Sequence, residues 1–142
     1  MSRSLVTVVA LVLVLAVSCA WADVTITSPT AGSTVGPATN VTGAASQKAF
    51  LVIYSEVFVT TTDENGQQHQ ELRGMVPGIR HWTNEDNSYA VKISTPRIYL
   101  NGGQAPAGPL SYVIHVKAYS APPSSATDTP DLGEATASVN SQ

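Results

Sequence analysis

A short polar segment around a tryptophan holds the residue types best suited to ligand binding. Arg80 and His81 directly precede Trp82, and Glu85 follows three residues later. A glycan site needs an aromatic ring beside charged and hydrogen-bonding groups, and this segment supplies both. The competing interpretation is that Trp82 packs on the core or closes one end of it, which is the commoner role of a lone tryptophan in a β-domain. The exposure of the indole distinguishes the two interpretations.

The remaining polar residues do not form a pattern that predicts catalysis. The chain has no Gly-x-Ser-x-Gly segment, and no two of its three histidines have the H-x-x-x-H spacing of a metal site. The paired carboxylates Asp63-Glu64 and Glu85-Asp86 are neighbours in turn-like segments, where charges are normally solvated. We therefore predict no enzyme, no cofactor and no metal ion. A polar pocket joining His81, Glu85 and His115 would instead favour a hydrolase, the third-ranked function.

The N-terminus predicts export. Arg3 is the only charge in the first 22 residues, an apolar run covers residues 5–17, and Ala20 and Ala22 follow it with A-x-A spacing. This order is that of a secretory signal peptide, so we expect residues 1–22 to be removed by cleavage before Asp23. The apolar run is shorter than the roughly 20 residues of a membrane-spanning helix.

A second interpretation of the same segment involves its cysteine. Residues 15–19 read LAVSC, which is similar to the box of bacterial lipoproteins in which the cysteine is lipidated. The position three residues before Cys19 holds Ala16, where that box prefers a larger aliphatic residue. We expect plain secretion, with lipid anchoring at Cys19 as the alternative.

Composition limits the possible partners of residues 23–142. Cys19 is the only cysteine of the chain, so the exported part must be stabilised by its core without disulfides, as suits a bacterial envelope or medium. The chain has seven basic residues, of which Arg3 lies in the predicted signal peptide, and the remaining six stand scattered against ten acidic ones. Hence we expect neither nucleic-acid binding nor a membrane span in the mature protein.

Residues 23–142 have the size of one domain, and their pattern predicts an all-β protein. Short runs of β-forming residues are separated by Gly, Pro, Asn and Asp clusters, and no sustained period of 3.6 indicates a helix. We expect strands at residues 24–27, 39–45, 49–62, 67–72, 88–95, 110–120 and 133–139. Residues 74–87 are expected to be irregular, with at most one short strand. Seven or eight antiparallel strands predict a Greek-key sandwich.

The run at residues 49–62 is apolar on both faces, which is unusual for a strand of a sandwich. One face carries Leu51, Ile53, Val57 and Val59; the other carries Phe50, Val52, Tyr54 and Phe58. Either the insertion at residues 74–82 covers the second face, or that face contacts a partner or a second copy of the chain. We also expect a bend or bulge near Ser55 and Glu56, because fourteen residues exceed the usual strand length.

Two segments near the start carry a family resemblance. Residues 26–35 read ITSPTAGSTV and residues 41–45 read VTGAA. This opening is similar to that of bacterial immunoglobulin-like domains, including the domain of spore-germination and envelope proteins. The resemblance implies an immunoglobulin-like sandwich that acts as a spacer, an adhesive module or a ligand-binding appendage. We therefore expect a non-catalytic module that binds an envelope protein or glycan, with a carbohydrate-binding module built on Trp82 as the alternative.

Overall fold

The computed structural model describes residues 23–95 and 109–142, which form an all-β protein of two packed sheets. The predicted signal peptide, with Cys19, lies outside the described residues. Eight strands are present in the described part, and the predicted all-β fold is confirmed. They are β1 (Val24–Ser28), β2 (Thr34–Val35), β3 (Ala38–Ala45), β4 (Phe50–Thr62), β5 (Gln68–Trp82), β6 (Ser88–Ser94), β7 (Leu110–Tyr119) and β8 (Glu134–Ser141).

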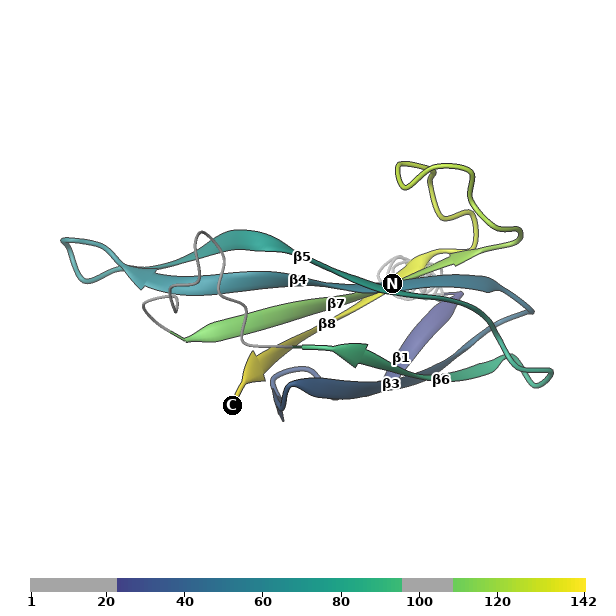
Figure 1. The fold of residues 1–142 in the computed structure, drawn as a ribbon, viewed down its shortest axis with the longest axis horizontal. Helices are drawn as coiled ribbons and strands as arrows, with labels where there is room; N and C mark the ends of the chain where they lie inside the picture. Colours follow the sequence, from purple (N-terminus) through teal and green to yellow (C-terminus); the bar gives the residue numbers. More distant parts are fainter. Residues whose placement is uncertain (1–22, 96–108) are drawn as a thin grey trace, which may run out of the picture.

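The chain alternates between the two sheets (Figure 1). One sheet has the strand order β1-β3-β6, and the other has the order β2-β8-β7-β4-β5. Every pair is antiparallel except β2 with β8. The chain crosses between sheets at five connections, which are β1 to β2, β2 to β3, β3 to β4, β5 to β6 and β6 to β7. This order is compatible with the immunoglobulin-like Greek key, which stays a prediction.

The core lies between the two sheets and follows the predicted alternation. On β4 the odd-numbered residues from Leu51 to Val59 are buried, and on β7 the even-numbered residues from Leu110 to Ala118 are buried. Tyr89 and Ile93 contribute from β6 on the facing sheet. Because side chains alternate along a strand, the even-numbered residues of β4 and the odd-numbered residues of β7 lie on the opposite, outward side.

The expectation of irregular structure was wrong for residues 74–82, because β5 is one continuous strand from Gln68 to Trp82, whereas residues 83–87 form a turn outside any strand. Gly74, Pro77 and Gly78 suggested a break, but β5 lies at the edge of its sheet, where proline costs no ladder hydrogen bond on the open side. The pairing with β4 shifts between Ile53 and Ser55 and again between Val57 and Phe58. The first shift is the irregularity expected near Ser55. A Cβ on Gly78 would lie 1.4 Å from the Ile53 carbonyl oxygen, so this bulge requires glycine.

A tyrosine joins all three strands of the smaller sheet. Tyr89 of β6 is buried and its hydroxyl donates a 2.7 Å hydrogen bond to the Thr25 carbonyl oxygen of β1. To reach β1, the ring passes over Gly43 of the intervening strand β3, where an added Cβ would lie 2.5 Å from the hydroxyl and 2.0 Å from the Thr25 oxygen. Burial raises the pKa of Tyr89, so the phenol stays protonated and keeps donating.

This crossing makes Gly43 a sensitive position. We expect Gly43→Ala to lower the free energy of unfolding by about 1–3 kcal/mol, because the methyl group displaces the Tyr89 ring or the β1 backbone. Urea unfolding monitored by tyrosine fluorescence measures the change. The matched control is Gly36→Ala, whose added Cβ would have a single neighbour at 3.7 Å. Equal stability of the two variants would contradict the packing argument.

Candidate functional site

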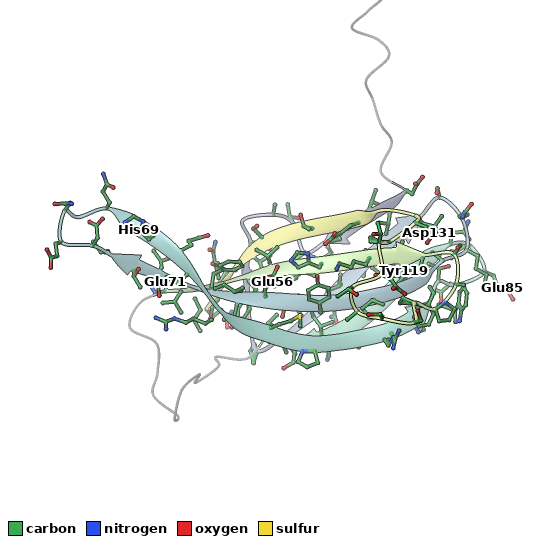
Figure 2. The ribbon with its side chains drawn as sticks, turned by 90° about the horizontal axis from the view of Figure 1, so that it is seen from above. Glu56, His69, Glu71, Glu85, Tyr119 and Asp131 are labelled. Carbon is green, nitrogen blue, oxygen red and sulfur yellow. The ribbon has the colours of Figure 1, made fainter. Side chains whose placement is uncertain are left out.

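The outward side of the five-stranded sheet, here called the outer face, holds most of the predicted site residues. It is formed by β5, β4, β7 and β8, and Figure 2 looks onto it. Cross-strand pairing arranges its side chains in rows. From one end of the face to the other, the rows are Trp82–Phe50–Tyr119, Arg80–Val52–Lys117–Glu134, Tyr54–His115–Thr136, Met75–Glu56–Val113–Ser138 and Leu72–Phe58–Ser111–Asn140.

Phe50, Val52, Tyr54 and Phe58, the predicted partner face, all lie on the outer face and are half-buried. The predicted cover does not exist in the form expected, because residues 74–82 are strand β5 beside β4 rather than an insertion above it. A different segment, the loop at residues 121–130 between β7 and β8, lies over one end of the outer face (Figures 1 and 2). Part of the face is therefore covered and part is open.

Trp82 lies at the end of the outer face and is 40% exposed. Its indole packs edge-on against Phe50, with ring centroids 5.3 Å apart, and the Arg80 guanidinium lies 5.5 Å from the centre of the same phenyl ring. The indole thus contacts an apolar neighbour and still presents surface to solvent. Burial of Trp82, which would have excluded a glycan platform, is not observed.

The other two residues of that segment do not join this cluster. His81 stands between Arg80 and Trp82 on β5, pairs with Leu51 and so belongs to the opposite side of the strand. Glu85 is exposed in the turn between β5 and β6, at the extreme end of the molecule in Figure 2. The residues of this segment therefore lie on the two sides of β5 and in the turn that follows it. Only Arg80 and Trp82 lie on the outer face.

A histidine held by two carboxylates occupies the middle of the outer face. His115 Nδ1 lies 2.6 Å from Glu134 Oε1, and its Nε2 contacts Glu56 Oε1. The imidazole is stacked on the Tyr54 ring, with centroids 4.7 Å apart and an interplanar angle of 6°. In a protonated imidazole both nitrogens donate, so the ring can serve both carboxylates at once.

Lys117 continues this cluster toward the covered end of the face. Its ammonium lies 5.4 Å from the centre of the Tyr54 ring, and Glu134 faces it across the strand pair. Partial burial by itself lowers the pKa of Lys117, but the hydrogen bond to Tyr54 and the charges around it outweigh burial and leave the pKa above its ordinary value. Lys117 is consequently a cation at neutral pH.

A pocket of about 380 Å³ lies between the outer face and the loop at residues 121–130. Its floor and sides come from β4, β5 and β7, and its roof comes from residues 123–126. The lining residues are Val52, Ile53, Tyr54, Met75, Pro77, Gly78, Ile79, Arg80, Lys117, Tyr119, Pro123, Ser124, Ser125 and Ala126.

Hydrogen bonds at both ends fix the roof of this pocket. Arg80 Nη2 donates to the Pro123 carbonyl oxygen at 3.2 Å, and the Tyr119 hydroxyl donates to the Asp128 carbonyl oxygen at 3.1 Å. The Asp128 carboxylate accepts from the backbone N–H groups of Ser124 and Ser125 at 2.8 and 3.1 Å. These N–H bonds and the Ser124 hydroxyl hold the pKa of Asp128 below its usual value.

The open part of the outer face lies on the hairpin formed by β4 and β5. Leu72 is 56% exposed and Met75 is 64% exposed, and Phe58 lies beside Leu72 on β4. At the tip of the hairpin, Asp63 Oδ1 accepts from the backbone N–H groups of Asn65 and Gln67, and His69 Nε2 lies 2.7 Å from Asp63 Oδ2. Polar contacts therefore fix the turn of the hairpin, whereas the two strands that lead to it carry apolar side chains on the outer face.

The three histidines lie apart. His69 is near the hairpin tip in Figure 2, His115 is in the centre of the face with Glu56, and His81 is on the other side of β5. His115 therefore has Glu56 and Glu134 as neighbours and not His81 and Glu85. Within residues 23–95 and 109–142, no group of three histidine, cysteine or acidic side chains is arranged to hold a metal ion.

Comparison with known proteins adds no family. No family model matches the chain, and no curated protein matches it. Among the residues that the structure describes, none belongs to a helix long and apolar enough to cross a bilayer.

Sequence reasoning missed two features of the site. The clamp of His115 by Glu56 and Glu134 depends on strands that are far apart in sequence, and only the register reveals it. Residues 121–130, which form the roof, lie between two predicted strands, and the sequence indicated only a loop there. The signal available in the sequence was its spacing of Ser124 and Ser125 before Asp128, which is typical of a carboxylate-capped turn.

The loop gives a test of pH dependence. Because the folded pKa of Asp128 is depressed from 3.8, its stabilising effect is present above that value and is lost as the pH falls through the folded pKa. We expect Asp128→Asn to accelerate hydrogen exchange at the Ser124 and Ser125 amides at neutral pH. The difference from the parent protein should disappear in strong acid, where the Asp128 carboxyl of the parent is protonated and no longer accepts as a carboxylate. Slow exchange in the variant at neutral pH would show that the carboxylate does not hold the roof.

Proposed function

We propose that the protein is an exported, non-catalytic module of the cell envelope that binds another protein through its outer face. The observation that carries the proposal is the exposure of Leu72, Met75 and Trp82 on the outer face. All three belong to β5, and the neighbouring strand β4 adds mainly apolar side chains to the same face. Exposed apolar side chains gathered on one face are typical of interaction surfaces. Trp82 lies at one end of the outer face and Leu72 at the other, and the cluster of His115 with its two glutamates lies between these ends.

The arrangement of polar groups supports binding rather than catalysis. A general base must be able to take a proton from a nucleophile or water. Both nitrogens of His115 already face carboxylates, and Tyr54 covers one side of the ring. The cluster is therefore satisfied internally, as expected of a group that fixes the strands and the charges of the face.

A glycan is the second candidate partner, and one observation favours it. The Trp82 indole is 40% exposed beside the Arg80 guanidinium, which gives an aromatic surface next to hydrogen-bond donors. A carbohydrate-binding module would use this end of the face, whereas a protein partner would also use the hairpin. The two functions therefore differ in whether they need the hairpin side chains Leu72 and Met75.

The partner can be sought with the purified protein as bait against envelope extracts and a polysaccharide panel, with cross-linking to map each contact. We expect a captured protein to cross-link beside the β4–β5 hairpin. The double substitution Leu72→Glu and Met75→Glu should then reduce affinity at least about tenfold, because buried anchors contribute about 2 kcal/mol each.

The matched control for that experiment is Lys92→Glu, an exposed position on β6 of the other sheet. Unchanged capture by the hairpin variant would contradict the proposal. Retention on a polysaccharide that is lost in Trp82→Ala, with no protein captured, would replace it by the carbohydrate-binding module.

Export is tested separately. We expect the protein recovered from outside the cytoplasm to begin at Asp23, because Ala20 and Ala22 satisfy the small-residue requirement of a signal peptidase. Mass spectrometry of the intact protein measures this. A mass that includes a lipidated Cys19 would establish anchoring instead of secretion, and a product that retains residues 1–22 would contradict cleavage.

A further inference from the structure

Two cationic residues flank the apolar floor of the pocket, Arg80 with its guanidinium over the Phe50 ring and Lys117 with its ammonium over the Tyr54 ring. Val52 of β4 pairs with Arg80 of β5 on one side and with Lys117 of β7 on the other. Neighbouring strands are about 4.8 Å apart, so the backbones that carry the two cations are about 10 Å apart. Both side chains line the same pocket. A ligand above Val52 therefore meets a positive group at each flank.

The acidic groups near this pocket are engaged elsewhere. Glu56 and Glu134 contact the two nitrogens of His115, and no carboxylate is among the residues that line the pocket. Asp128 accepts from the backbone of the roof, and the nearby Asp131 accepts from the Ser120 N–H at 2.9 Å. The charge directed into the pocket is consequently positive.

The two cations retain donors for a ligand. A guanidinium carries five N–H donors, and Arg80 uses one of them for the Pro123 carbonyl oxygen. An ammonium carries three, and Lys117 directs its charge toward the Tyr54 ring. Hydrogen bonds from ionised donors to a carboxylate are about twice as strong as neutral ones.

The volume and the lining residues of the pocket indicate the size and chemistry of the ligand that it can hold. At about 380 Å³ the pocket is near the lower end of the range of small-molecule sites, roughly 300–1,000 Å³. Its apolar lining includes Val52, Met75 and Ile79. Ser124 lines the roof, and its hydroxyl donates to Asp128 Oδ2 at 3.1 Å, so the oxygen keeps lone pairs that can accept from a ligand hydroxyl. A compact ring with hydroxyl groups and one carboxylate matches this combination.

An extended acidic peptide matches the site less well. Peptides that add to a sheet need a regular row of backbone groups at the edge. Beside the pocket, β5 offers Pro77, which has no N–H, and the bulge at Gly78. The backbone of β5 therefore cannot pair evenly with a second strand at this point.

We propose that this pocket binds a uronic acid unit of an acidic glycan, with its carboxylate held by Arg80 and Lys117. The site goes beyond the protein-binding role proposed above, since its charged residues Arg80 and Lys117 do not carry that role, although Met75 belongs to both surfaces. Either proposal can fail without the other.

The test uses the purified protein titrated with sodium D-glucuronate, with binding followed by NMR chemical shifts and calorimetry. D-glucose is the matched neutral sugar, and sodium acetate is the matched carboxylate without a ring. We expect saturable glucuronate binding that shifts the resonances of Val52 and of residues 123–126. Glucose and acetate should bind at least about tenfold more weakly, because each lacks one of the two recognised features.

Two variants assign the site. Lys117→Gln should raise the Kd for glucuronate roughly tenfold, and this side chain makes no hydrogen bond to the roof in the structure, so the loop is left in place. Arg80→Gln should do the same while also freeing Pro123. Lys92→Gln, on the other sheet, is the control and should bind normally. Equal binding of glucose or acetate, absence of glucuronate binding, or unchanged affinity in Lys117→Gln would each overturn the proposal.

Discussion

The pairing of β4 with a strand on each side is the constraint on which the rest of the structure depends. Its residues from Phe50 to Val59 pair with β7, and the whole strand pairs with β5. Because strand side chains alternate, this one register sends Leu51, Ile53, Val57 and Val59 into the core and fixes every row of the outer face. A slip by one residue would bury Glu56 and expose the core, so the register is strongly determined. The tight passage of Gly78 over the Ile53 carbonyl group fixes the neighbouring strand in the same way.

The outer face combines two physical environments on one sheet. In its centre, His115 joins Glu56 and Glu134, and these contacts satisfy charges that would otherwise be costly on a half-buried surface. Toward the hairpin the face is apolar and open, and toward the loop at residues 121–130 it is roofed and positive. The sheet thus separates an exposed apolar region from a pocket, with the His115 cluster between them. The core itself carries one unmatched group: among the described residues, the buried Ser55 hydroxyl has no hydrogen-bond partner, at the point where the β4–β5 pairing shifts.

The parts of this fold that local patterns determine were predictable from the sequence. The strands expected at residues 49–62, 88–95 and 110–120 are present as β4, β6 and β7, because burial on one side of a strand leaves a period of two in the residue types. Residues 74–82 were not predictable in this way, since Gly74, Pro77 and Gly78 have the composition of a loop and become a strand only through pairing with β4. Trp82 and Arg80 were proposed as site residues from their types, and this stays a prediction. Their separation from His81 follows from the pleat of β5. The placement of Arg80 and Lys117 on either side of Val52 follows from the strand order, which local patterns do not contain.

The hairpin of β4 and β5 reaches past its neighbours, as Figure 1 shows. The register with β7 ends at Val59, so Thr60–Thr62 pair only with β5 among the described strands. A two-stranded ribbon has little cooperative support of its own, and opening its tip breaks no contact of the core. The tip of this hairpin can therefore fray and re-form while the sandwich stays intact. A partner that grips Leu72 or Met75 would damp this fraying, so occupancy would register as slower amide exchange at a distance from the contact itself.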